Sequence, residues 1–179
     1  LVWISVVSER LCCYDLKAGR FVDFTGCGEY AQPYQRVMRS SNGDIWMWHE
    51  RYGCRRVRCN NGVFSSTTFR KENGNLSSNT VTHLAEDEKG SIWILTSDGV
   101  ERVKGDKAEQ VLRMPSPTAL FSGQHAFFVS ADGRVFKEEG GSLKEMAHIP
   151  GNPAATVTGS MLLQDDLYIF SSAGSYIYH

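Results

Sequence analysis

An aromatic residue recurs along this chain at a nearly regular spacing, usually just after a turn and an aliphatic residue. The copies are Trp3 in LVWIS, Trp46 in NGDIWMW, Trp93 in KGSIWIL, Phe128 in HAFFVS and Tyr168 in DDLYIFS. Their separations are 43, 47, 35 and 40 residues. Periods of roughly 40–50 residues with about four strands each are typical of β-propeller blades. The spacing therefore predicts a repeat architecture in which these five residues are the structural anchors.

The stretch from Leu76 to Gly105 shows what one unit contains. Residues 81–87 roughly alternate between apolar and polar, and residues 92–96 form a compact β-branched and aromatic run, so both favour strands. Gly90 stands where the intervening turn needs a positive φ, and Asp98 with Gly99 marks a tight hairpin. The unit is predicted to be an antiparallel meander with Trp93 buried in the seam between sheets.

The same order of strands and turns can be followed through most of the chain, and Asn61-Gly62 is its strongest hairpin signal. We therefore expect an all-β fold in which residues 1–179 form a single β-propeller segment of about four blades with four antiparallel strands each. The chain opens and closes within predicted strands, which favours a segment of a larger propeller. Closure of this segment alone would require strands in residues 1–24 to pair with strands in residues 162–179.

The composition excludes several classes of function. The chain has 179 residues, 41% of them hydrophobic, and a net charge of −1 from 19 basic and 20 acidic residues. Such a chain can bury a core but has no field to attract a polyanion, so nucleic acid is not an expected partner. The sequence shows neither an apolar run of roughly 20 residues nor a signal-peptide pattern.

The unit at residues 76–100 resembles the two-component regulator propeller repeat. The resemblance rests on the order Leu, Ser-Asn, Val, Glu-Asp, Gly and Ile-Trp-Ile, followed by Thr and Gly. The matching residues are Leu76, Ser78, Asn79, Val81, Glu86, Asp87, Gly90, Ile92, Trp93, Ile94, Thr96 and Gly99. The copy at residues 40–57 keeps Gly43, Ile45, Trp46 and Gly53. The copies around Phe128 and Tyr168 keep only the anchor and the turns.

This resemblance implies a function. Proteins with this repeat are often the extracytoplasmic sensors of hybrid two-component systems in gut Bacteroidetes, where propellers precede a β-sandwich, a membrane helix and a cytoplasmic kinase. It implies a periplasmic segment without catalytic activity or cofactors of its own. Its ligand would be a small oligosaccharide or other polar molecule, and its partners the rest of the propeller and the β-sandwich. Open sheet edges also favour a homodimer.

The best candidates for ligand binding are Trp48, His49, Arg51 and Tyr52, predicted to lie in the loop between the second and third strands of their blade. Aromatic rings can stack on a sugar and a guanidinium can orient it. The alternative is that Trp48 fills the neighbouring seam and that the arginines among residues 51–58 form a solvated strand face.

No other pattern points to catalysis or to a metal. Adjacent His49 and Glu50 point to opposite faces of a strand and cannot share a substrate proton. Five cysteines, Cys12, Cys13, Cys27, Cys54 and Cys59, show no zinc spacing and are interpreted as buried free thiols. Cys54 and Cys59 are five residues apart on one strand, hence on opposite faces.

Two other functions remain open. Lyases and glycosidases also use propellers, and an enzyme would need titratable residues from different blades to meet near the axis. The predicted inner-strand positions Val37, Val81 and Ala85 are apolar and supply no such set. A propeller that binds only proteins is the third alternative.

Overall fold

The chain is built from β-strands, as a computed structural model shows. The structure describes residues 1–5, 11–22, 34, 36–122, 125–149, 156–163 and 166–178. These residues contain strands and turns but no helix, and none of them belongs to a helix that could cross a bilayer. The predicted all-β fold is confirmed.

The described strands form five antiparallel sheets, which we number in chain order. Sheet 1 contains β1 (Val2–Ser5), β2 (Leu11–Asp15) and β3 (Arg20–Phe21). Sheet 2 contains β4 (Arg36–Arg39), β5 (Ile45–His49), β6 (Gly53–Asn60) and β7 (Val63–Phe69). Sheet 3 contains β8 (Val81–Glu86), β9 (Ile92–Thr96), β10 (Gly99–Lys104) and β11 (Lys107–Arg113).

The two remaining sheets follow the same order. Sheet 4 contains β12 (Thr118–Ser122), β13 (His125–Val129), β14 (Arg134–Glu139) and β15 (Ser142–His148). Sheet 5 contains β16 (Val157–Leu163), β17 (Asp166–Ser171) and β18 (Gly174–Tyr178). Each sheet is a meander in which consecutive strands pair.

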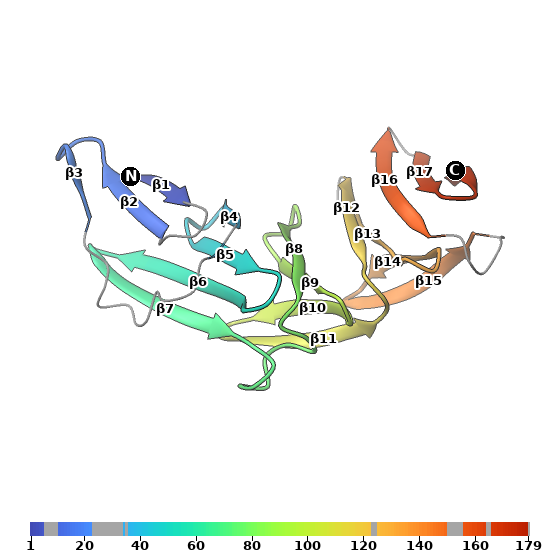
Figure 1. The fold of residues 1–179 in the computed structure, drawn as a ribbon, viewed down its shortest axis with the longest axis horizontal. Coiled ribbons are helices and arrows are strands. Elements are labelled where there is room, and N and C mark those ends of the chain that lie inside the picture. The colour runs from blue at the N-terminus through green and yellow to red at the C-terminus, as the bar shows by residue number, and fades with distance from the viewer. Residues whose placement is uncertain are drawn as a thin grey trace.

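The five sheets follow one another along an arc (Figure 1). The first strands β4, β8, β12 and β16 lie toward its concave side, and the last strands β7, β11 and β15 lie along its convex side. Sheets 1 and 5 lie at opposite ends of the arc, and no described strand of one pairs with a described strand of the other. The arrangement is that of propeller blades in an open ring.

Apolar seams hold neighbouring sheets together. Because side chains alternate along a strand, each inner sheet presents one face forward, to the next sheet along the chain, and one face backward. In sheet 2, Trp46 and Trp48 face forward and pack with Val81 and Ile94 of sheet 3. The backward residues of the same strand pack with Cys13 and Trp3 of sheet 1. Every inner sheet is thus buried on both faces.

The anchors Trp46 and Trp93 occupy equivalent positions. Both lie on the second strand of their sheet, face forward and are at most 1% exposed. Trp46 pairs with Arg56 and Trp93 with Arg102, and each guanidinium lies over the indole ring, 5.4 and 5.2 Å from the centroid. Cation–π contact of this kind is strongest when it is buried. The predicted equivalence of the two tryptophans is confirmed.

The anchor of sheet 4 is shifted by one residue from the predicted position. Phe127 pairs with Lys137, whose Nζ lies 5.8 Å from the ring centroid, as the arginines do over the tryptophans. Phe128 faces backward instead and packs on Trp93, with ring centroids 5.0 Å apart. Phe128 is fully buried but does not occupy the repeated position, so this anchor assignment was wrong.

The end sheets carry the remaining anchors. Trp3 faces sheet 2 and is half-buried, with its ring edge-on to Phe64. Tyr168 of sheet 5 pairs with Ile177, while its neighbours Leu167 and Ile169 face backward into the seam with sheet 4. Tyr168 therefore lies on the forward face of sheet 5, which no described residue of another sheet covers.

The turn before the anchor tryptophan differs between sheets 2 and 3. In sheet 3, Asp87 accepts hydrogen bonds from two backbone N–H groups of the turn and from Trp93 Nε1 at 2.8 Å. In sheet 2 the corresponding residue is Ser40, whose hydroxyl donates within its own turn, and no described residue forms a hydrogen bond with Trp46 Nε1. Among the residues that the structure describes, the turn of sheet 2 thus provides no acceptor for this indole N–H.

Candidate functional site

The predicted ligand residues do not form one loop. Trp48 and His49 belong to strand β5 and are only 6% and 8% exposed. Arg51 and Tyr52 follow in the turn before β6, where Arg51 is exposed and Tyr52 half-buried. Trp48 was predicted to lie in an accessible loop; it packs instead in the seam between sheets 2 and 3.

His49 points away from Trp48 because the two are neighbours on a strand. Its Nδ1 accepts a hydrogen bond of 2.9 Å from the backbone N–H of Arg51, and its ring lies 4.6 Å from the ring of Tyr52. Burial lowers the pKa of His49, which favours the neutral imidazole. His49 and Tyr52 thus stabilise their own turn, on the other face of sheet 2 from Trp48.

Two residues that sequence reasoning missed meet beside Trp48. Arg36 is the register partner of Trp48, and His83 of the next sheet lies edge-on to the Trp48 ring, with centroids 6.2 Å apart. Arg36 and His83 are both exposed. They come from the first strands of sheets 2 and 3, which lie toward the concave side of the arc (Figure 1). We call this pair the Arg36–His83 site.

Burial and the neighbouring Arg36 determine the protonation of His83. Partial burial, and then the positive charge of Arg36, lower the pKa of His83. The imidazole is therefore favoured in its neutral form, which offers one donor and one acceptor beside a guanidinium with several donors. This set can bind hydroxyl groups or a carboxylate. No local pattern in the sequence pairs the two residues, because β4 (RVMR) and β8 (VTHLAE) each contain further polar residues.

The arginines of β6 do not form the solvated face that was considered. Arg56 is 2% exposed and donates a 2.7 Å hydrogen bond to the carbonyl of Gly105, in the turn between β10 and β11. It also pairs with Asp106 of that turn and lies 3.8 Å from Asp44. Arg58 completes the cluster through Asp44 at 3.1 Å. Arg56 is thus a buried bridge from sheet 2 to sheet 3.

A buried carboxylate also lies in this seam. Glu101 is 0% exposed and accepts hydrogen bonds from the backbone N–H and hydroxyl of Ser77 and from the hydroxyl of Thr96. Its Oε2 has no hydrogen-bond partner in the described part of the chain. Burial raises the pKa of Glu101. Ser77 belongs to the connection between sheets 2 and 3, so Glu101 fixes that connection.

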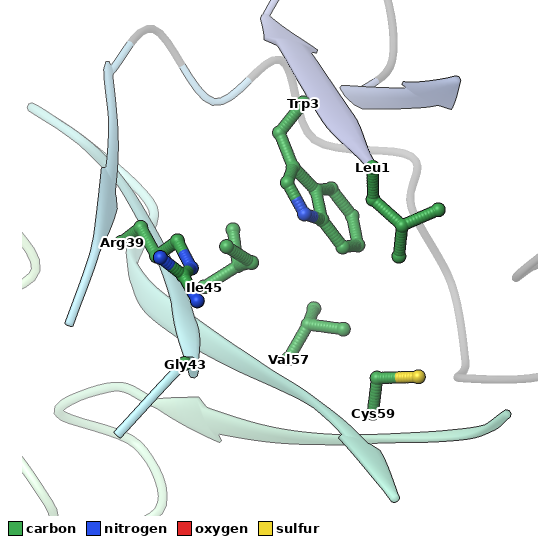
Figure 2. Close-up of a pocket in the computed structure, with 7 residues that line it drawn as sticks. All are labelled: Leu1, Trp3, Arg39, Gly43, Ile45, Val57 and Cys59. Carbon is green, nitrogen blue, oxygen red and sulfur yellow. The ribbon is translucent and has the colours of Figure 1, made fainter. Parts of the chain in front are cut away.

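A cavity of about 340 Å³ lies between sheets 1 and 2 (Figure 2). Its lining residues are Leu1, Trp3, Arg39, Gly43, Ile45, Val57 and Cys59. Arg39 comes from the end of β4 and Cys59 from β6, while Trp3 points across from β1. The cavity is therefore of mixed polarity, with the side chains of Leu1, Ile45 and Val57 beside a guanidinium, a thiol and an indole ring.

The cysteines differ in exposure. Cys13 and Cys54 are buried, Cys12 is half-buried and Cys59 is exposed, all as free thiols. Cys27 lies outside the described residues. Cys54 and Cys59 face opposite sides of sheet 2, as predicted, but the interpretation of Cys59 as buried was wrong. Among the described residues, no three His, Cys, Asp or Glu side chains gather in a way that could hold a metal ion.

One stretch of the chain matches a known protein family. Residues 75–98, which include β8 and β9, match the family model of the two component regulator propeller. This stretch is thus similar to the two component regulator propeller repeat. The Asp87–Trp93 hydrogen bond thus lies inside the repeat. No curated protein is detectably similar to the chain in sequence.

Solved structures show the same fold around the two component regulator propeller repeat. The extracellular domain of a hybrid two component system of B. thetaiotaomicron matches with TM-score 0.67 and 14% identity over 98% of this chain and 26% of its own. A second such domain matches with TM-score 0.59 and 20% identity over 99% and 27%. Virginiamycin B lyase from Staphylococcus aureus matches with TM-score 0.59 and 15% identity over 94% and 62%. The chain thus spans about a quarter of the two B. thetaiotaomicron domains.

Proposed function

We propose that this chain is part of an extracytoplasmic, periplasmic propeller that senses a ligand for a hybrid two-component system. The repeat at residues 75–98 and the likeness of fold to extracellular domains of such systems support this proposal. In this role the segment binds and does not catalyse, and the signal passes through the rest of the propeller and a β-sandwich to a kinase.

The ligand is an oligosaccharide or another polar molecule. The observation that carries this step is the Arg36–His83 site, where exposed donors from two adjacent sheets meet over a buried aromatic ring. Convergence of polar groups from separate elements is typical of ligand sites. Binding between sheets also gives the ligand a way to act on their relative position, because each state of the seam would bind it differently.

Calorimetry with a panel of oligosaccharides tests the ligand class. Arg36→Gln and His83→Ala should each weaken binding about 10-fold or more, the loss of one or two hydrogen bonds to a charged or polar group. The matched control is Arg113→Gln, an exposed arginine on β11 of sheet 3. Binding unaffected by both site variants contradicts this site, and a panel without any ligand contradicts the saccharide class.

The signalling role has a separate test. The gene that encodes this chain should also encode a histidine-kinase domain, and a gene without one contradicts the two-component proposal. The enzyme alternative remains relevant because virginiamycin B lyase shares the fold. Incubation of each bound oligosaccharide with the protein, followed by mass spectrometry of the sugar, distinguishes them: cleavage supports a lyase or glycosidase, and intact ligand supports a sensor.

A further inference from the structure

The residue that pairs with the anchor of one sheet reaches the outer hairpin of the next sheet. Arg56, the register partner of Trp46, donates to the carbonyl of Gly105 in the turn between β10 and β11. Arg102 has the same position in sheet 3 and lies near the turn between β14 and β15. Its Nη1 is 3.8 Å from the position of a Cβ added to Gly141. Two successive seams thus share one bridging position.

Sheet 1 has a cysteine in this bridging position. Cys13 is the register partner of Trp3, as Arg56 is of Trp46, and it is 1% exposed. Its neighbours in the seam between sheets 1 and 2 include Val57. A thiol therefore stands where sheets 2 and 3 carry a guanidinium, and it faces the following sheet as they do.

Sheet 2 has a second cysteine at the other end of the bridge. Gly53 and Gly99 each begin the third strand of their sheet and pair with the last residue of the second strand. Gly105, which accepts the bridge in sheet 3, follows Gly99 by six residues. Cys59 follows Gly53 by the same six residues. Cys59 thus has in sheet 2 the position that Gly105 has in sheet 3.

The two thiols lie among the same side chains. Cys59 lines the cavity between sheets 1 and 2 together with Trp3, Ile45 and Val57 (Figure 2). These three residues also belong to the cluster that packs around Cys13. Burial raises the pKa of Cys13, and the neighbouring Cys59 raises it further, which fits two thiols in one seam.

We propose that Cys13 and Cys59 form a disulfide that joins sheet 1 to sheet 2 when an external disulfide is present as the oxidant. The exposed thiolate of Cys59 attacks the external disulfide, forms a mixed disulfide and releases one thiol. The thiolate of Cys13 then attacks the sulfur of Cys59 and releases the second thiol. Both cysteines are oxidised, the external disulfide is reduced, and the two protons of the cysteines end on the released thiols.

The remaining described cysteines cannot replace either partner. Cys12 is adjacent to Cys13 on β2 and points to the other face of sheet 1. Cys54 packs in the seam between sheets 2 and 3, on the opposite face of sheet 2 from Cys59. The cross-link does not depend on the Arg36–His83 site. The extracytoplasmic location of the proposed function would supply the oxidant, because disulfides form and persist in oxidising compartments.

Oxidation of the folded chain with glutathione disulfide tests the cross-link. Iodoacetamide then blocks the remaining thiols, and trypsin digests the chain without reduction. Mass spectrometry should find peptide 11–17 joined to peptide 59–70 in most molecules, lighter by two hydrogen atoms than the sum of the two. Fragmentation of this product should assign the bond to Cys13. Alkylation of Cys59, which is open in the reduced chain, should be largely lost.

Matched variants identify the partners. Cys13→Ser should abolish the joined peptides, whereas Cys12→Ser, a change in the same peptide, should keep them. Cys54→Ser should keep them as well. A bond from Cys59 to any cysteine other than Cys13, a bond found only between two copies of the chain, or glutathione adducts without joined peptides would each overturn the proposal.

Amide hydrogen exchange tests whether the bond joins the two sheets in the fold. Oxidation should slow exchange in β2 about tenfold or more, because opening of sheet 1 is then restricted, and should leave β17 at the other end of the arc unchanged. Cys13→Ser treated in the same way should show no change in β2. Joined peptides that form only in urea, or unaltered exchange in β2 after complete oxidation, would overturn the proposal.

Discussion

The guanidinium of Arg56 lies over the indole ring of Trp46 and donates to the carbonyl of Gly105 in the next sheet. One side chain thus joins the repeated anchor of sheet 2 to the outer hairpin of sheet 3. Arg102 makes the corresponding contact with Trp93.

Replacement of Arg56 by Ala should lower the free energy of unfolding by about 3 kcal/mol. The change removes charged hydrogen bonds and a buried cation–π contact, each worth roughly 1–3 kcal/mol, and leaves Asp44 without one of its two arginines. Urea unfolding measures the loss. Arg113→Ala, on an exposed position, should stay within about 0.5 kcal/mol of the unmodified chain. If the free energy of unfolding of Arg56→Ala is also within about 0.5 kcal/mol of the unmodified chain, the Arg56 bridge contributes nothing to stability.

Glu101 should make the stability of the chain depend on pH in an unusual direction. Its pKa in the fold lies above the ordinary value of 4.5, because burial disfavours the charged form. The folded state therefore binds the proton more tightly than the unfolded state. The stabilising contribution of Glu101 is complete below about pH 4.5 and is lost as the pH rises through the folded pKa.

The difference between the unmodified chain and Glu101→Gln isolates this effect from the other carboxylates. Gln keeps the acceptor for Ser77 and Thr96 but cannot titrate. From pH 4.5 upward, the unmodified chain should lose stability relative to the variant, measured by urea unfolding at each pH. A constant difference would mean that Glu101 has the same pKa in both states.

Trp48 and Arg51 should respond differently to replacement by Ala. Trp48 is buried in the seam, so its removal should cost roughly 3–5 kcal/mol of stability, whereas exposed Arg51 should change stability by less than about 0.5 kcal/mol. Thermal unfolding distinguishes the two. Any loss of ligand binding in Trp48→Ala must then be distinguished from unfolding of the variant. An unaltered melting temperature of Trp48→Ala would contradict its packing in the seam between sheets 2 and 3.

Cys54 and Cys59 should differ in reactivity toward iodoacetamide. Burial raises the pKa of Cys54 well above its ordinary value, so its thiolate is scarce as well as inaccessible. Cys59 is exposed and should be alkylated in the native chain, whereas Cys54 should react only after unfolding. Peptide mass spectrometry checks both, and native labelling of Cys54 at a similar rate would mean that the seam opens frequently.

The exposed faces of the two end sheets should cause head-to-tail association. The forward face of sheet 5 exposes Met161, Leu163 and Phe170, and the opposite end of the arc exposes Val2 and Ile4 of sheet 1. Every inner seam joins two such faces, so one copy can cover the next. Light scattering should show a mass that rises with concentration.

Variants that carry a charged residue on one end face test the head-to-tail contact directly. Phe170→Glu and Ile4→Glu should each limit association, and an equal mixture of the two should form dimers and nothing larger, because one intact face of each kind remains. A mixture that behaves as either variant alone, or an unmodified chain that stays monomeric at all concentrations, would contradict head-to-tail contact.

The repeat period was enough to predict the strands, their meander order and the equivalence of Trp46 and Trp93. It was not enough to choose between Phe127 and Phe128, because both are aromatic and the choice depends on which face the register turns forward. The basic partner on the next strand, Lys137, decides it. A pattern that included an aromatic residue and its basic partner could have found the correct anchor.

The candidate site was harder to predict. The aromatic and charged run at residues 46–58 suggested Trp48 and His49 as ligand-binding residues, yet both are buried. Arg36 and His83 are separated by 47 residues in sequence and meet only because sheets 2 and 3 pack together. Such a pair depends on the position of whole sheets, which local patterns do not specify.

In an open arc, local unfolding should spread from one sheet to the next. Each sheet packs on its neighbours along the arc, and sheets 1 and 5 lie at opposite ends (Figure 1). The chain therefore resembles a row of coupled units, in which opening begins at the ends and passes from one unit to the next. Amide hydrogen exchange should be slowest in β9 and its paired strands at the middle of the row. A weakened Arg56 bridge should speed exchange in β10 well before the amides of β17 respond.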